Sequence, residues 1–205
     1  MALTNKGLIQ FIKSKIGTPY VYGMKGAVMT TEKYNMLKKA YGSAVWDSDK
    51  KKIGKVCCDC SGLISWYTGI QRGSSQYKAM AKQVHPISTI KSAPIGAAVW
   101  QQGHIGVYIG NGEYIAEDGS AYGCRKNQLS KARFTHWFLI SDIKYIEEDD
   151  EMVETSKIKI NGQYYTISRI LKDGNNYIKI RDLEKAGFKI SSEGSIAVLD
   201  YKGKK

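Results

Sequence analysis

Apolar residues near the start of the chain recur three or four positions apart, as on one face of a helix. The pattern predicts a helix over residues 4–16, which ends before Pro19. The same spacing predicts a second helix after Thr31 that ends before Gly42, and a third over residues 60–68. The first third of the chain is therefore predicted to be mainly helical.

From Pro94 the pattern changes to short runs of β-branched and aromatic residues separated by Gly and Asn. The runs are AAVW at 97–100, HIGVYIG at 104–110, EYIAED at 113–118 and HWFLISDIKYI at 136–146. Helices followed by consecutive strands indicate an α+β domain, with helices packed on an antiparallel meander.

The tail has its own alternating pattern. KIKING, QYYTIS, NYIKIR and SIAVLDY are predicted strands, and RDLEKAG is a predicted short helix that ends at Gly187. The stretch EEDDEMVE at 147–154 carries six negative charges and is typical of a solvated linker. We therefore expect a domain at 1–146, a linker at 147–156 and a small α+β module at 157–205.

Composition limits the possible partners. The hydrophobic fraction of 42% and the charged fraction of 24% are those of a soluble globular protein. The sequence contains no run of about 18 apolar residues, so it predicts no membrane span. The lysine-containing start MALTNKGLIQFIKSKIG does not resemble an export signal, so we expect synthesis in the cytoplasm.

The formal net charge of +12 suggests an anionic partner. The segment at 1–146 carries +12 and the segment at 155–205 carries +6, and the acidic stretch lies between them. Lysines are scattered over both segments, and neither a zinc-finger spacing nor an RNA-binding signature is present, which argues against nucleic acid. A membrane surface and an anionic cell wall both remain open as partners, and oligomeric state is left open.

Cysteine usage points to thiol chemistry. Three of the four cysteines, Cys57, Cys58 and Cys60, fall within four positions, a poor arrangement for paired disulfides. Cys60 is predicted to lie in the first turn of the third helix, with Asp59 as the N-cap. Helix N-termini favour the thiolate form, which is the nucleophile in cysteine catalysis.

A cysteine nucleophile needs a base, and the sequence offers three histidines. His85 precedes a proline in a predicted loop, and His136 lies near the end of the predicted domain. His104 opens a predicted strand, which would aim its ring rigidly. His104 is therefore the candidate base.

Three motifs now stand in order over about 120 residues: GTPYVYG at 17–23, CDCSGLISWY at 58–67 and GHIGVYIGNG at 103–112. Together they resemble the NlpC-type family of papain-like cell-wall peptidases. The insertion at 24–56 is similar to one in clostridial phage lysins. The resemblance implies an endolysin that cuts peptidoglycan stem peptides, after D-Glu and before the diamino acid, without a metal or cofactor.

The resemblance also implies roles for single residues. Cys60 is the nucleophile, whose backbone N–H helps to stabilise the oxyanion, and His104 is the base. Tyr22, Asp59 and Ser61 would contact the peptide of the substrate and its free amine.

The third catalytic residue is where this chain departs from the family. The family usually has a polar residue four positions beyond the glycine equivalent to Gly112, where this chain has Ala116, followed by Glu117 and Asp118. A three-residue loop at 110–112 would place Asp118 opposite His104, whereas a two-residue Asn-Gly turn would place Glu117 on that face. Because the family's third residue shares the histidine's face, we prefer Asp118.

Three other interpretations remain open. Cys57 and Cys60 have the spacing of a zinc knuckle, but the sequence has no second pair of ligands. A related enzyme could instead be an amidase that cuts between the sugar-linked lactate and L-Ala. Finally, the tail resembles a small secreted module related to the copper amine oxidase N-terminal type, and could serve in wall binding or dimerisation, even in a protein without catalysis.

Overall fold

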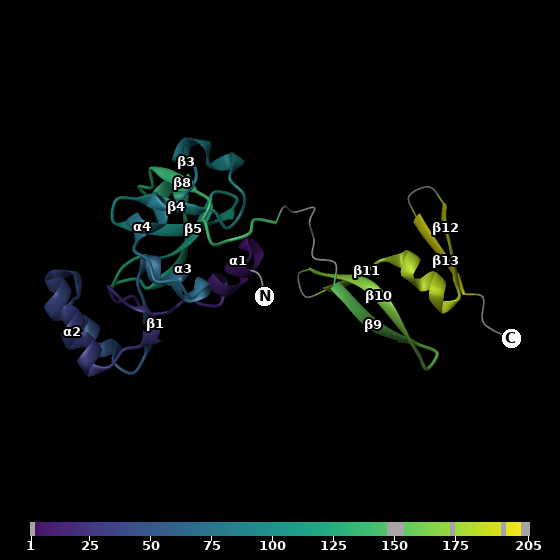
Figure 1. Ribbon diagram of the computed structural model, residues 1–205, viewed down its shortest axis with the longest axis horizontal. Helices are drawn as coiled ribbons and strands as arrows, with labels where there is room; N and C mark the ends of the chain where they lie inside the picture. Colours follow the sequence, from purple (N-terminus) through teal and green to yellow (C-terminus); the bar gives the residue numbers. More distant parts are fainter. Residues whose placement is uncertain (1–2, 147–153, 173–174, 194–195, 202–205) are drawn as a thin grey trace. The chain divides into compact units, whose positions relative to one another are not determined.

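The computed structural model describes residues 3–146, 154–172, 175–193 and 196–201. The chain divides into two compact units, and the boundary in the sequence falls between Ile146 and Glu147 (Figure 1). Most of the predicted linker at 147–156 lies outside the described residues. Its last three residues do not: they begin strand β9 (Glu154–Ile160), because they pair with β10 of the second unit.

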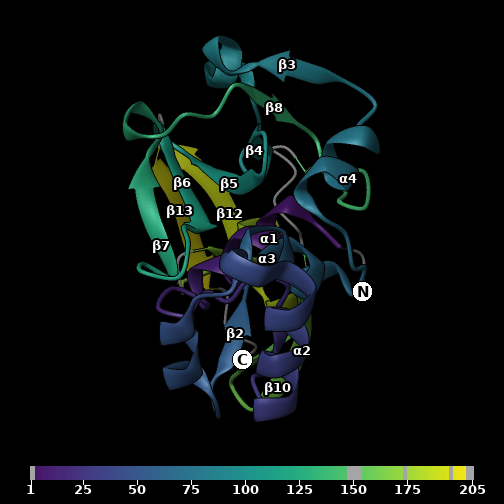
Figure 2. The same ribbon diagram turned by 90° about the vertical axis from the view of Figure 1, so that its left-hand side faces the viewer.

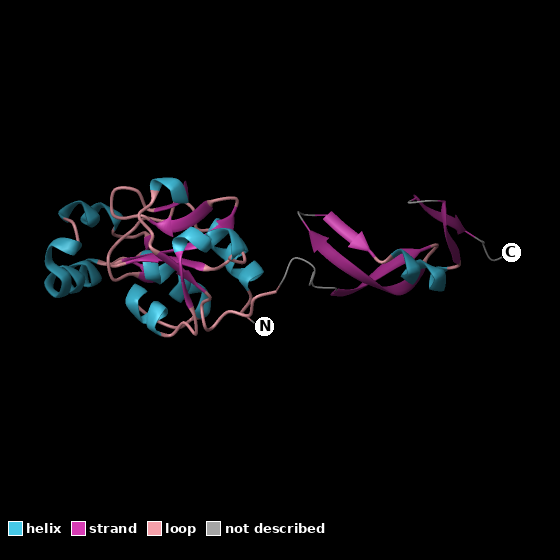
Figure 3. Cartoon of the chain, turned by 90° about the horizontal axis from the view of Figure 1, so that it is seen from above, coloured by secondary structure: helices cyan, strands magenta, loops and turns pink. Residues whose placement is uncertain are grey.

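The first unit contains both helices and strands (Figure 3). Its α-helices are α1 (Asn5–Lys13), α2 (Thr31–Tyr41), α3 (Cys60–Thr68) and α4 (Ser74–Ala79). The predicted bounds of α2 and α3 are confirmed. The helix predicted over 4–16 is shorter, since Thr4 caps its first turn and helical geometry ends at the C-cap, Ser14.

The main sheet of this unit has the strand order β3-β8-β4-β5-β6-β7, with antiparallel neighbours. The bounds are β3 (Val84–Pro86), β4 (Ala98–Gln101), β5 (His104–Gly110), β6 (Glu113–Glu117), β7 (Cys124–Gln128) and β8 (His136–Phe138). Short 3-10 helices lie at Ile87–Ser92 and Leu129–Lys131. The predicted α+β meander is confirmed.

Apolar side chains cover both faces of this sheet. Ile105 and Val107 of β5 face the cluster that includes Leu63 of α3, and α1 and α3 pack together there. Tyr108, one position further along β5, belongs to a separate cluster with Trp137 on the other face. Figure 2 shows α1 and α3 next to each other, in agreement with their contact. The alternation along β5 therefore reflects a strand buried on both sides.

The insertion at 24–56 forms a small subdomain with its own core. Strands β1 (Lys25–Val28) and β2 (Val56–Cys58) pair, and α2 stands apart from the main sheet (Figure 1). Two 3-10 helices, Gly42–Ala44 and Asp47–Lys52, complete it. The buried residues of this core are Val21, Met24, Met29, Tyr34, Leu37, Val45 and Cys57.

Two local predictions for the first unit are wrong. The strand predicted over 136–146 ends at Phe138, because Ile140 and Ile143 are buried beside α1 instead of being paired in the sheet. The apolar pattern there reflects burial rather than strand pairing. His85 lies in strand β3 rather than in a loop, and its ring stacks on Trp137 at a centroid distance of 4.2 Å.

The second unit contains two small antiparallel sheets, β11-β10-β9 and β12-β13. The bounds of the remaining elements are β10 (Gln163–Lys172), β11 (Asn175–Ile178), a 3-10 helix (Ile180–Ala186), β12 (Phe188–Glu193) and β13 (Ile196–Tyr201). The short helix ends at Gly187 with φ of 90°, as predicted, although it is 3-10 rather than α. Strand β12 was not predicted, because its sequence FKISSE is only weakly apolar.

Candidate active site

Cys60 is the first residue of α3 and is 7% exposed. Asp59 has extended backbone angles, and its Oδ1 accepts a hydrogen bond from the N–H of Gly62 at 2.6 Å, so it is the N-cap that the sequence predicts. Gly62 allows the helix to approach the preceding loop closely, since an added Cβ would lie 2.4 Å from the carbonyl oxygen of Met24. The thiol therefore sits at the positive end of a tightly held helix.

His104 is the first residue of β5, and its Nε2 lies 3.3 Å from Oδ1 of Asp118. The other carboxylate oxygen of Asp118 accepts a hydrogen bond from Nε of Arg125 at 2.7 Å. Phe134 stacks on the His104 ring, with centroids 5.5 Å apart and planes 10° apart. The imidazole is thus fixed at one edge by a carboxylate and across one face by an aromatic ring.

The electrostatics of this group favour a charged imidazole. Burial alone would lower the pKa of His104, but hydrogen bonds to Asp118 and Cys60, together with their negative charges, raise it to about 9. Burial would raise the pKa of Asp118, but its bonds to His104 and Arg125 hold that pKa below its ordinary value. At neutral pH the arrangement therefore favours an imidazolium at His104, next to the carboxylate of Asp118.

The hairpin that aligns His104 with Asp118 differs in one respect from the prediction. Asn111 and Gly112 form a two-residue turn with positive φ at both positions, and Gly110 pairs with Glu113. An irregularity between Tyr108 and Gly110 then shifts the register by one, so that Tyr108 still pairs with Tyr114. The bulge produces the register that was expected from a three-residue loop.

Glu117, the alternative third residue, is the last residue of β6 and is fully buried, and Asp118 follows it directly. Within the described part of the chain, neither of its carboxylate oxygens has a hydrogen-bond partner. Burial first, and then the negative charge of Asp59, raise its pKa to about 9. Glu117 is therefore a neutral acid at pH 7 and does not bond His104.

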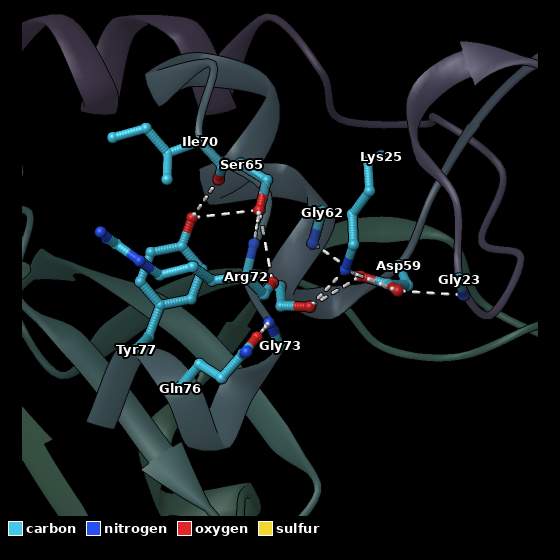
Figure 4. Close-up of polar contacts among 11 residues, drawn as sticks. Gly23, Lys25, Asp59, Gly62, Ser65, Ile70, Arg72, Gly73, Gln76 and Tyr77 are labelled. Carbon is cyan, nitrogen blue, oxygen red and sulfur yellow. Dashed lines mark hydrogen bonds and ion pairs between the residues drawn. The ribbon is translucent and has the colours of Figure 1, made fainter. Parts of the chain in front are cut away.

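The other predicted site residues are Asp59, Ser61 and Tyr22. Asp59 and Ser61 are buried, and Lys25 of β1 donates hydrogen bonds to both of them (Figure 4 shows Lys25 and Asp59). The acceptor pair that was expected to contact a substrate amine therefore already holds an ammonium of the chain itself. Tyr22 is 39% exposed and packs edge-to-face on Tyr41 of α2.

The remaining cysteines are buried side chains. Burial raises the pKa of Cys57 to about 11 and that of Cys124 to about 12, and it raises the pKa of Cys58 as well. All three are free thiols that stay protonated at neutral pH. Among the described residues, no group of three or more His, Cys, Asp and Glu side chains is placed to hold a metal ion.

Sequence reasoning missed three residues of the site: Lys25, Arg125 and Phe134. Arg125 follows Cys124 on β7 and reaches Asp118 because Ala116 and Arg125 are paired across β6 and β7. The strand pattern did not identify β7, whose sequence CRKNQ is polar. Lys25 and Phe134 lie in segments that give no local signal of a catalytic role.

A scan against protein-family models found no match, and a search of curated proteins found no similar protein. The solved structures similar to this chain include NlpC/p60 proteins. No helix in the described residues is both long and apolar enough to cross a membrane.

Three of these structures illustrate the similarity. The peptidoglycan hydrolase RipB from Mycobacterium tuberculosis is 26% identical, with 69% of this chain and 65% of that chain covered and a TM-score of 0.46. NlpC1 from Trichomonas vaginalis is 16% identical, with coverages of 66% and 43% and a TM-score of 0.45. The P60 domain of an antigen from M. avium subspecies paratuberculosis is 23% identical, with coverages of 66% and 93% and a TM-score of 0.46.

The chain thus spans less than two thirds of the first two structures.

Proposed function

We propose that this protein is a cysteine endopeptidase that hydrolyses peptide bonds in bacterial peptidoglycan. The observation that carries the proposal is the arrangement of Cys60, His104 and Asp118: a thiol at a helix N-terminus, an imidazole whose pKa that thiol helps to raise, and a carboxylate within 3.3 Å of that imidazole. This is the nucleophile, base and orienting group of covalent peptide hydrolysis.

The chemistry proceeds in two steps. The Cys60 thiolate attacks the scissile carbonyl carbon, and the His104 imidazolium donates its proton to the leaving amine as the C–N bond breaks. The neutral imidazole then takes a proton from water, whose oxygen attacks the thioester and releases the acid and the thiolate. Asp118 holds the ring through both steps and stabilises its charged form.

The substrate is inferred from the motif resemblance. We assign the bond between D-Glu and the diamino acid of the stem peptide, with the lactyl–L-Ala amide bond as the alternative. The insertion at 24–56 extends the proposal to a phage endolysin, made in the host cytoplasm and acting on the wall.

The decisive experiment is digestion of purified peptidoglycan by the full-length protein, followed by mass spectrometry of the products. New amino termini on the diamino acid would support endopeptidase cleavage, and new termini on L-Ala would identify an amidase. Loss of all products in Cys60→Ser, but not in Cys57→Ser, would tie the activity to the proposed nucleophile. If the wild-type protein releases no product from walls, the proposal is wrong.

The second unit is proposed to hold the enzyme on the anionic wall. Residues 155–205 carry +6, and the side chains of Tyr164, Tyr177 and Tyr201 are exposed. Full-length Cys60→Ala should therefore sediment with purified walls at low salt and be released at high salt. Equal binding to walls stripped of their anionic polymers would contradict an electrostatic role.

A further inference from the structure

Lys25 contacts both residues that flank the proposed nucleophile. Its ammonium donates to Oδ1 and Oδ2 of Asp59 at 2.8 and 2.9 Å and to Oγ of Ser61 at 2.6 Å. The Lys25 side chain is 20% exposed, whereas that of Asp59 is 8% exposed. A fixed cation of the chain is therefore partly open to solvent beside Cys60.

The two carboxylate oxygens of Asp59 are fully used as acceptors. Oδ1 of Asp59 also accepts from the hydroxyl of Ser61 at 3.0 Å and from the N–H of Gly62, and Oδ2 accepts from the N–H of Gly23 at 3.0 Å. Figure 4 shows Gly23 and Lys25 approaching the Asp59 carboxylate from different sides. Neither carboxylate oxygen of Asp59 has a lone pair left to bind a second ammonium.

Charge leads to the same conclusion. Asp59 and Lys25 together form a neutral, mostly buried ion pair, so a substrate ammonium placed beside it would add an uncompensated positive charge close to a like charge. A neutral amide carries no such penalty. Discrimination of this kind, by repelling the wrong ligand, is a common route to specificity.

We propose that Lys25 is a specificity-determining residue that selects stem peptides whose N-terminus is acylated, as in intact peptidoglycan, over fragments with a free amine. This inference rests on the proposed function and names the substrate class of the same site. Lys25 supplies from within the chain the ammonium that Asp59 and Ser61 would otherwise take from the substrate.

The test uses two synthetic stem peptides, L-Ala-γ-D-Glu-diamino acid with a free or an acetylated N-terminus. The wild-type protein should cleave the acetylated peptide with kcat/KM at least about tenfold higher, and Lys25→Met should shift this ratio by about tenfold or more toward the free amine. Lys39→Met, a change of an exposed lysine in the same insertion, is the matched control and should keep the wild-type ratio.

Asp59 keeps three other donors in Lys25→Met, so the variant is expected to fold, and circular dichroism checks this. A measurement on the wild-type protein gives an independent answer. Its relative rate on the free-amine peptide should rise as pH passes about 8, where an α-amino group loses its charge.

The inference is overturned if the wild-type protein cleaves the free-amine peptide as well as the acetylated one. It is also overturned if folded Lys25→Met keeps the wild-type ratio, or if the wild-type ratio does not change with pH. Failure to cleave either peptide or any bond of purified walls would refute the proposed function, and this inference with it.

Discussion

The two sides of the candidate site are built in different ways. On one side, His104 and Asp118 are brought together by a single hairpin of neighbouring strands, and their separation in sequence is short. On the other side, Asp59 and Ser61 meet Lys25 across 34 and 36 positions, from a strand of the insertion. The first side provides the chemistry that the motifs predict, and the second side adjusts which substrate reaches it.

The difference shows where a sequence motif is informative. Local pairing fixes the geometry of the hairpin once its register is known, so a motif carries most of the information about the catalytic group. The contact of the insertion with Asp59 depends on how β1 and β2 pair, which no local pattern specifies. We therefore expect changes on the hairpin side to affect rate and changes on the insertion side to affect substrate preference.

The largest expected effect is the loss of the nucleophile, on which both sides depend. Cys60→Ala should reduce turnover of a muropeptide to the background, because the protonated thiols of the other cysteines cannot replace the thiolate. Circular dichroism should show an unchanged fold. Cys57→Ala is the matched control, and activity lost there but retained in Cys60→Ala would reassign the nucleophile.

The second largest effect is expected from a substitution on the hairpin side alone. Asp118→Asn should lower kcat/KM by roughly 10- to 1,000-fold, because the imidazole loses the group that orients it and stabilises its charge. The raised pKa of His104, about 9, should also fall, so the alkaline limb of the pH–rate profile should move to lower pH.

Glu117→Gln is the matched control for Asp118→Asn, since it makes the same chemical change at the adjacent, fully buried position. It should leave the rate and the pH profile nearly unchanged. The reverse order of damage would mean that Glu117, not Asp118, orients the base.

Glu117 should instead affect stability. Its pKa is raised from 4.5 to about 9 in the folded chain, so the folded state binds more protons than the unfolded state between these values. The free energy of unfolding should therefore fall as pH rises through this window, by at most about 1.4 kcal/mol per pH unit from this group. Urea unfolding at several pH values should show that Glu117→Gln removes this slope, and an unchanged slope would contradict the assignment.

Much of the fold could be predicted because local signals agreed with tertiary packing. Asp59 marked the start of α3, and the alternation along β5 identified a strand. The prediction failed where burial came from another source, as after Phe138, where the apolar residues pack beside α1. It also failed for the turn at Asn111, since the bulge that restores the register leaves no clear sequence mark.

The candidate site could also be predicted only in part. Cys60, His104 and Asp118 are brought together in the structure as the sequence predicted, whereas no motif indicated Lys25. A lysine in an insertion has many possible exposed positions, and only the folded chain places its ammonium on Asp59. The charge balance beside the nucleophile could therefore be determined only from the structure.

The smallest expected effect separates the two partners of Asp118. Arg125 donates to Oδ2 of Asp118, and its side chain is 40% exposed, so solvent replaces much of its contribution in Arg125→Ala. We expect kcat/KM to fall only a few-fold, roughly the loss of one partly exposed charged hydrogen bond.

The pH profile is the sharper measurement. Removing a positive charge near Asp118 should raise the pH of the alkaline limb set by His104, whereas Asp118→Asn should lower it. Arg125→Lys keeps the charge and should leave the limb in place. If Arg125→Ala and Asp118→Asn shift the limb in the same direction, Arg125 acts by holding Asp118 in position rather than by its charge.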